Sequence, residues 1–213
     1  MSDEDAHGER PLREDELAPT WLEQFERWLG EATRDGIYEP EAMVLATADA
    51  DARPSARTVL LKGCDEQGFV FFTNLHSRKG RELESNPHAA LVFPWHAVHR
   101  QVLVTGAVSQ IEPDRSDAYF ASRAYGSRIL EDRAAGDHAR LPARAVLEDA
   151  RTQAERRFPP DRPVPRPPWW GGLLLVPESV EFWQGRRDRL HDRLRYRRPA
   201  QGAGPWLIER LSP

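Results

Sequence analysis

The sequence predicts a mainly β protein, an antiparallel barrel with peripheral helices. Along its 213 residues we expect seven or eight short strands and three or four helices. The strands follow one another as hairpin-like neighbours and do not alternate with helices, as they would in a doubly wound sheet. A chain of this length can bury a sizeable core as one medium domain without disulfides. The pattern therefore favours a barrel.

The N-terminus differs in composition from the rest of the chain. Residues 1–16 hold seven acidic residues and two arginines, and residues 1–18 lack apolar periodicity, so we expect a mobile acidic tail before a single domain at 19–213. The tail has no apolar signal core, and the single Cys64 cannot form an internal disulfide. Both features favour the reducing cytoplasm.

Composition and charge exclude several classes of protein. The chain is 30% charged and 39% hydrophobic, and no apolar run approaches the roughly 20 residues that span a bilayer, so we expect no membrane partner. The net charge of -4 argues against nucleic-acid binding, which usually needs a basic face.

The first elements are a helix and three strands. Thr20 and Glu23 form a capping-box pattern that opens a helix, and its apolar stripe consists of Trp21, Leu22, Phe25, Trp28, Leu29 and Ala32. Residues 42–48 read as a buried strand. Residues 56–62 and 68–74 read as strands joined by a short turn, and we expect them to pair as an antiparallel hairpin.

A short helix then begins near Ser77 and runs through Leu83. A serine, Arg78 and Lys79 at a helix N-terminus form a phosphate cradle of backbone N–H groups, helix dipole and side-chain charge. A capped surface helix with solvated charges gives the same pattern.

The second half is predicted to contain two helices, at 114–122 and 143–158, with Val146 and Ala154 facing inward in the latter. Between them, residues 123–128 are expected to form a loop. Residues 159–168 hold six prolines and form an extended connector within the domain. The remaining predicted strands are 88–95, 101–109, 173–176, 179–183 and 206–211.

The segment 183–198 concentrates seven arginines and one histidine. As a strand it would place Arg189, His191 and Arg193 on one face and Leu194 and Tyr196 on the other. An amphipathic helix fits the same residues. The preceding Phe-Trp-Gln-Gly is an unusual start for a solvated helix and favours the strand.

Several common catalytic motifs are missing: the sequence has no GxSxG, HExxH, P-loop or GxGxxG. His96 and His99 lack further ligands nearby, so no metal site is expected. The candidates that remain are bases at predicted strand ends, whose convergence would bind a phosphorylated ligand: Arg57, Lys62, Arg78, Lys79, Arg123, Arg189 and Arg193. Arg57 and Lys62 lie on opposite faces of an unbroken strand, so both meet one ligand only if the strand bends or ends there.

Six segments, in order along the chain, strongly resemble the pyridoxamine 5'-phosphate oxidases. They are RTVLLK (57–62), FFTNLHSRKGREL (71–83), NPHAALVFPW (86–95), RQVLVTG (100–106), YFASR (119–123) and EFWQGRRDRLHDRLRY (181–196). The resemblance implies an antiparallel split β-barrel of the FMN-binding type, a homodimer with FMN at its interface. It also implies an FMN-dependent oxidase that converts pyridoxamine or pyridoxine 5'-phosphate to pyridoxal 5'-phosphate with O2, releasing H2O2.

The resemblance also implies residue roles. The residues implied to bind FMN are Arg57, Lys62, Phe72, Thr73, Arg78, Lys79, Gln101, Trp183 and Arg193. Those implied to bind the substrate phosphate are Lys62, Tyr119, Arg123 and Ser127. Arg189 and His191 are implied to contact the substrate's pyridine ring and to act in catalysis, His191 by orienting the ring or handling a proton.

The chain departs from the family pattern at two places. No Arg-x-x-Tyr lid segment precedes residue 17, and Gly136-Asp137 replaces a Gln-Ser pair that touches flavin. These departures keep two alternatives open. One is a phenazine-type FMN oxidase acting on a larger aromatic intermediate, and the other is a non-catalytic protein that binds flavin or pyridoxal phosphate.

Overall fold

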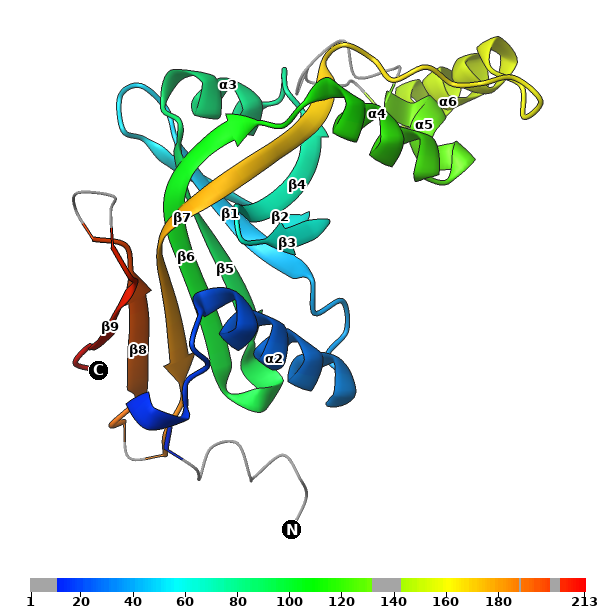
Figure 1. Ribbon diagram of the computed structural model, residues 1–213. Coiled ribbons are helices and arrows are strands. Elements are labelled where there is room, and N and C mark those ends of the chain that lie inside the picture. Colours follow the sequence, from blue (N-terminus) through cyan, green and yellow to red (C-terminus); the bar gives the residue numbers. More distant parts are fainter. Residues whose placement is uncertain (1–10, 132–142, 188, 200–203) are drawn as a thin grey trace.

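The computed structural model describes residues 11–131, 143–187, 189–199 and 204–213, which form a single antiparallel sheet with helices around it (Figure 1). The strands are β1 (Ala42–Ala48), β2 (Pro54–Leu60), β3 (Gly63–Asp65), β4 (Gly68–Asn74), β5 (His88–Trp95), β6 (Arg100–Gln110), β7 (Trp170–Gln184), β8 (Asp192–Arg197) and β9 (Leu207–Arg210). The helices are α2 (Trp21–Arg34), α3 (Arg78–Ser85), α4 (Pro113–Ser122), α5 (Tyr125–Glu131) and α6 (Ala145–Arg157), with 3-10 turns η1 (Glu14–Glu16) and η2 (His96–Val98). The predicted mainly β fold with peripheral helices is confirmed.

The sheet runs in the order β2-β1-β5-β6-β7-β4-β3, and β8 pairs with β7 and β9. The predicted hairpin between 56–62 and 68–74 is wrong, because β2 pairs with β1, and the partners of β4 are the short β3 and β7. The chain leaves the β1 ladder after Leu60, and the backbone N–H of Lys62 donates to the Val70 carbonyl at 2.8 Å. A common ligand of Arg57 and Lys62 would need such a break. The break connects β2 to β3, the two strands at the ends of the order given above.

Strand β7 is the longest and joins the two halves of the sheet. Its first half pairs with β4 and its second half with β8, while β6 runs along both. The β6–β7 register shifts between Thr105 and Gly106, where a Cβ on Gly106 would lie 2.0 Å from the Val176 carbonyl oxygen. The bulge bends one continuous strand where the sequence predicted two separate strands at 173–176 and 179–183.

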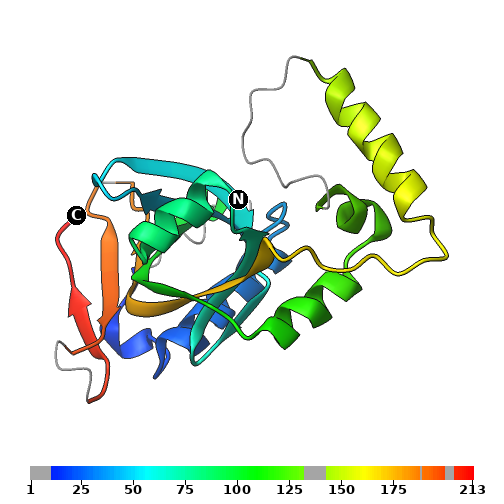
Figure 2. The same cartoon turned by 90° about the horizontal axis from the view of Figure 1, so that it is seen from above.

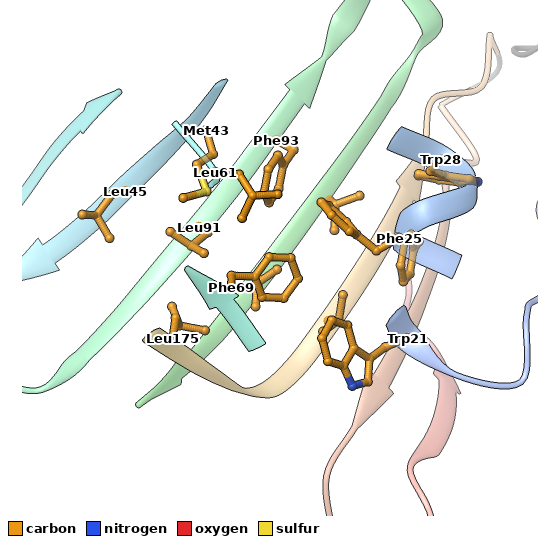
Figure 3. Close-up of a cluster of buried hydrophobic side chains, with 14 of the residues drawn as sticks. Trp21, Phe25, Trp28, Met43, Leu45, Leu61, Phe69, Leu91, Phe93 and Leu175 are labelled. Atoms are coloured by element: carbon orange, nitrogen blue, oxygen red, sulfur yellow. The ribbon is translucent and has the colours of Figure 1, made fainter. Parts of the chain in front are cut away.

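Helix α2 covers the barrel core, as its apolar stripe predicts (Figure 3). The Thr20 side chain accepts from the Glu23 N–H, and the Glu23 carboxylate accepts from the Thr20 N–H, so the predicted capping box is confirmed. The Phe25 ring lies 5.0 Å from Phe69 and 4.9 Å from Phe93, and Trp28 lies edge-on to a β7 aromatic. Each such buried ring contributes about 1.5–3 kcal/mol by leaving water.

Helices α4, α5 and α6 lie together at one end of the molecule, away from α2 (Figures 1 and 2). Residues 125–131 form α5, where the sequence predicted a loop. In α6, Ala154 is buried as predicted, but Val146 is 39% exposed, so the prediction that it faces inward is wrong. The sequence pattern of α6 therefore identified the helix but not its buried face.

Residues 12–14, near the start of the described chain, contact Asp192 and Arg210 of β8 and β9. Leu12 is buried, its N–H donates to Asp192 at 3.1 Å, and Arg210 donates to the Leu12 carbonyl and to Glu14. Residues 12–16 are therefore packed against the domain, which differs from the expected mobile tail; residues 1–10 lie outside the described part of the chain.

Within the described ranges, no helix is long and apolar enough to cross a membrane. The same part of the chain contains no group of three or more His, Cys, Asp or Glu side chains arranged to hold a metal ion.

Candidate functional site

A groove lined mainly by cationic side chains lies between β2 and α3. It encloses about 460 Å³ and is lined by Ser55, Ala56, Arg57, Arg78, Lys79 and Arg81, and we call it the cation groove. Helix α3 begins there as predicted, because the Ser77 side chain accepts from the Gly80 N–H at 3.4 Å. The ammonium of Lys79 donates to Ser77 Oγ at 3.0 Å. Three of the predicted cofactor residues, Arg57, Arg78 and Lys79, thus share one groove.

A buried carboxylate, Glu82, lies beneath this groove. One of its oxygens accepts from Thr47 Oγ1 at 2.5 Å, Ser55 Oγ at 2.6 Å and Arg57 Nη2 at 3.2 Å. The other accepts from Arg78 Nε at 2.7 Å. Burial raises the pKa of Glu82, but these hydrogen bonds outweigh burial and hold the pKa at about 2, so the carboxylate is ionised.

A second cluster combines stacked aromatic rings with an arginine. Phe72 of β4 stacks on Tyr119 of α4 at 4.0 Å and on Trp170 of β7 at 5.3 Å. The Arg123 guanidinium lies 4.8 Å above the Trp170 ring and donates to Glu131 at 3.0 Å. The cluster joins predicted residues of both the cofactor and the substrate sets.

Arg123 has hydrogen-bonding capacity left over. Its Nη1 atom is buried and has no hydrogen-bond partner among the described residues. A buried N–H group without an acceptor is costly, so an anion placed there would be bound favourably. Two other predicted residues near these clusters differ in exposure: Thr73 of β4 is buried, and Ser127 of α5 is exposed.

A third cluster lies across β6, β7 and β8. The ladder places Gln101 opposite Trp183 and Trp183 opposite Arg193. Arg193 donates twice to the buried Glu181, from Nε at 2.7 Å and from Nη2 at 3.1 Å. These hydrogen bonds raise the pKa of Arg193 and hold its guanidinium against Glu181 of the neighbouring strand β7.

The predicted catalytic residues lie in the turn before β8. His191 Nδ1 accepts from the backbone N–H of Arg186 at 3.0 Å, and the imidazole lies 4.9 Å from the Trp183 ring. Because Nδ1 accepts, the neutral imidazole carries its hydrogen on Nε2, which can donate a hydrogen bond. Arg189 is exposed and has φ of 62°, the left-handed region that side chains rarely adopt.

The arginine segment is a strand only from residue 192 to 197, where Leu194 and Tyr196 are buried as the strand pattern predicts. Arg189 and His191 therefore do not continue one strand face with Arg193, because the chain turns between them. The period-two pattern did not predict this turn, which contains the left-handed backbone conformation of Arg189.

The three clusters do not form one continuous groove within the described chain. The cation groove is built on β2 and α3, and the third cluster on β6, β7 and β8, with β1 and β5 between β2 and β6 in the sheet. Lys62 is exposed at the break after β2. Gly136 and Asp137, which depart from the family pattern, lie outside the described residues.

The sequence analysis did not identify three carboxylates that form ion pairs with predicted site arginines. They are Glu82, Glu131 and Glu181. Only Glu82 had a local signal, since it lies four residues after Arg78 on the predicted helix. The other two pairs depend on tertiary structure.

Comparison with known families matches nearly the whole domain. The family described as "Pyridoxamine 5'-phosphate oxidase" matches residues 29–157, and the "Pyridoxine 5'-phosphate oxidase C-terminal dimerisation region" matches residues 170–213. The second match covers β7, β8 and β9, and so includes Trp183 of β7 and Arg193 of β8 from the third cluster.

Individual relatives carry enzyme names that agree with these two family matches. The pyridoxine/pyridoxamine 5'-phosphate oxidase of Acidothermus cellulolyticus is 52% identical over 95% of this chain and 90% of its own length. That of Thermobifida fusca is 50% identical over 95% and 93% of the two chains.

Two solved structures share the fold. PhzG from Burkholderia lata 383, crystallised with tetrahydrophenazine-1-carboxylic acid, superposes with a TM-score of 0.87 at 29% identity and covers 97% of this chain and 100% of its own. A pyridoxamine 5'-phosphate oxidase-related, FMN binding protein from Nostoc punctiforme has a TM-score of 0.70 at 20% identity, over 92% of this chain and 100% of its own, and supports the fold alone.

Proposed function

Because this chain belongs to the pyridoxamine 5'-phosphate oxidase family of flavin-dependent oxidoreductases, we propose that it converts pyridoxamine and pyridoxine 5'-phosphate to pyridoxal 5'-phosphate. In this proposal FMN is the cofactor, O2 accepts the electrons and H2O2 is released. The observation that carries the proposal is identity of about half the residues over nearly the full length of curated enzymes of that name.

The cation groove fits the phosphate of FMN. Arg57, Arg78 and Lys79 supply charge-assisted donors, and the first turn of α3 adds backbone N–H groups. Lys62, Phe72 and Thr73 lie on the adjoining β2–β4 region and complete the proposed cofactor set on this side.

The second cluster fits the phosphate of the substrate. The buried Nη1 of Arg123 lacks an acceptor, and a phosphate oxygen would satisfy it. Tyr119, Ser127 and Lys62 are the proposed additional donors. Tyr119 is fixed by its stack on Phe72, so its ring is held in place before substrate binds.

The turn before β8 fits the role of positioning the reacting ring. A bound flavin would supply the chemistry by accepting a hydride from the substrate and passing the electrons to O2. Arg189 supplies a fixed positive charge for the pyridine ring, and His191 supplies Nε2, because its Nδ1 is held by the Arg186 N–H. Trp183, Gln101 and Arg193 are the proposed cofactor contacts on this side.

We further propose that FMN lies at the interface of a homodimer. The C-terminal match to a dimerisation region supports the homodimer, and it includes Trp183 and Arg193. The separation of the cation groove from the third cluster supports a site assembled from two protomers, each contributing one side.

The test is to load the purified protein with FMN and to measure turnover in air. We expect a flavin spectrum, a dimer in solution, and H2O2 and pyridoxal 5'-phosphate formed in equal amounts from pyridoxine 5'-phosphate. Absence of flavin binding, or flavin binding without either product, would refute the proposal.

A second candidate function follows from the likeness to PhzG, whose structure holds a larger aromatic ligand. If the FMN-loaded chain oxidised a reduced phenazine carboxylic acid but not pyridoxine 5'-phosphate, the phenazine-type function would replace the first. If neither compound reduced the flavin, a non-catalytic binding protein would remain.

A further inference from the structure

We propose that Glu82 is the positioning residue that aims Arg57 and Arg78 into the cation groove and thereby sets the affinity for the phosphate of the cofactor. This inference rests on the proposed function, because it takes FMN as the ligand of the groove. It concerns a residue that does not touch the ligand but orders the groups that do.

The contacts of Glu82 reach both arginines. Its side chain is only 5% exposed, whereas that of Arg57 is 22% exposed and that of Arg78 is 56% exposed. One carboxylate oxygen accepts from Arg57, and the other accepts from Arg78. Arg78 is thus attached through Nε and keeps its two Nη groups for the groove. Arg57 uses both Nη groups inside the network and on the Leu45 carbonyl, so its Nε–H and its positive charge remain for the groove.

Two hydroxyls extend the network between Glu82 and Arg57. Ser55 and Thr47 each donate to Glu82, and each accepts from Arg57, with 2.5 Å between Arg57 Nη1 and Thr47 Oγ1. A hydroxyl has one proton and two lone pairs, so donating that proton to Glu82 leaves its lone pairs for Arg57. The carboxylate therefore sets the direction of every hydrogen bond in the network.

An amide in place of this carboxylate keeps the size and reverses part of the polarity. In Glu82→Gln, one of the two positions becomes an NH2 group that faces either the hydroxyls and Arg57 or the Nε of Arg78. Donors then face donors, and at least one arginine must move away. Arg57 and Arg78 also lose the buried negative charge of Glu82, which offsets the repulsion among the positive groups of the groove.

The electrostatic alternative predicts the opposite sign. If Glu82 acted only as a nearby negative charge, its removal would make the groove more positive and would tighten phosphate binding. If Glu82 positions the arginines, its removal weakens phosphate binding. The sign of the change in affinity therefore separates the two roles.

The experiment measures dissociation constants of FMN and of riboflavin, which lacks the phosphate, for the wild type and for Glu82→Gln. We expect FMN to bind about 10–100-fold more weakly to the variant, the loss typical of one or two charged hydrogen bonds, and riboflavin to change by less than about 3-fold. Glu84→Gln makes the same change at an exposed carboxylate of the same helix; it is the matched control and should bind both flavins as the wild type does. Unchanged or tighter FMN binding by Glu82→Gln, or an equal loss for riboflavin, would overturn the inference.

Two further measurements keep the result interpretable. If Glu82→Gln does not fold, Thr47→Val removes one hydroxyl of the network, and it should weaken FMN binding more than riboflavin binding; an equal effect on both overturns the inference. Inorganic phosphate is the probe independent of flavin: it should raise the unfolding temperature of the wild type more than that of Glu82→Gln. A wild type that responds to phosphate in this way but binds no FMN would refute the proposed function and retain the inference, whereas an equal response in both proteins would refute the inference.

Discussion

Lowering the pH from 7 to 3 should narrow the difference in stability between the wild type and Glu82→Gln. The pKa of Glu82 is about 2 in the folded protein, against 4.5 for the free side chain. The ionised carboxylate therefore stabilises the folded state fully above pH 4.5, and this stabilisation is lost as the pH falls toward 2. The amide of the variant does not titrate, so the variant lacks this dependence.

The size of the effect follows from the two pKa values. Their difference corresponds to about 3 kcal/mol of stabilisation at pH 7 and to about 1 kcal/mol at pH 3. The stability gap should thus shrink by roughly 2 kcal/mol over this range. Other carboxylates with lowered pKa values, such as Glu14, are present in both proteins and cancel in the comparison.

The assay is urea unfolding followed by tryptophan fluorescence at several pH values between 7 and 3. The seven tryptophans include the buried Trp28 and Trp95, so unfolding changes the signal strongly. Equal urea dependences of the two proteins would justify comparing their free energies of unfolding directly. A stability gap that stays constant between pH 7 and pH 3 would refute the assignment of an ionised, hydrogen-bonded Glu82.

Three further predictions concern the other site arginines. Arg189→Ala should lower kcat/KM for pyridoxine 5'-phosphate by about 100-fold or more while changing FMN affinity by less than about 3-fold, because Arg189 is proposed to act on the substrate ring; steady-state kinetics and a fluorescence titration measure the two effects. Glu131→Gln should lower KM for the phosphorylated substrate by about 3–10-fold, because it releases Arg123 from a competing carboxylate; initial rates at varied substrate concentration measure this. Glu181→Gln should destabilise the fold by about 1–3 kcal/mol and weaken FMN binding, because Arg193 loses one of its two hydrogen bonds and the negative charge that it faces; urea unfolding and an FMN titration measure both.

Matched controls separate these effects from general damage. Arg187→Ala changes an exposed arginine in the same turn as Arg189, and its kinetics should stay near those of the wild type. Glu148→Gln breaks an exposed pair on α6 and should leave KM unchanged. Release of flavin by Arg189→Ala with normal turnover of the loaded enzyme, a KM raised by Glu131→Gln, or normal stability and FMN affinity in Glu181→Gln would each contradict the corresponding role.

Local patterns in the sequence were enough to place most elements of the fold. The capping box at Thr20, the serine that begins α3 and the uninterrupted apolar run of β5 depend on neighbours in sequence, and all three were located correctly. These signals are local because helix caps and strand alternation are local hydrogen-bonding and burial patterns.

Which of the consecutive strands pair with one another could not be obtained in this way. The hairpin predicted between 56–62 and 68–74 failed because β2 is hydrogen-bonded to β1 along its whole length, from Ala48 opposite Pro54 to Ala42 opposite Leu60. The short Gly- and Asp-containing loop at 63–67 signals that a hairpin exists, but the break after Leu60 moved the hairpin to the short β3. Tertiary packing decided between the two pairings.

The candidate site was predicted only in part, because contacts between side chains far apart in the sequence leave no local pattern. The shared location of Arg57, Arg78 and Lys79 was expected, whereas the carboxylates that hold the site arginines were not. Glu181 contacts Arg193 across two strands, and Glu131 reaches Arg123 between two helices, so neither pair has a fixed spacing along the chain. The arginines could be identified as anion-binding candidates, but their orientation required the structure.

The most direct test of the proposed function is an anaerobic single turnover. The FMN-loaded protein is mixed with pyridoxine 5'-phosphate in the absence of O2, and the flavin absorbance and pyridoxal 5'-phosphate are followed together. We predict that the flavin absorbance bleaches while pyridoxal 5'-phosphate appears in an amount equal to the flavin, and that admitting O2 restores the absorbance with release of H2O2. A flavin spectrum that stays unchanged after addition of pyridoxine 5'-phosphate and of pyridoxamine 5'-phosphate would contradict the proposed function.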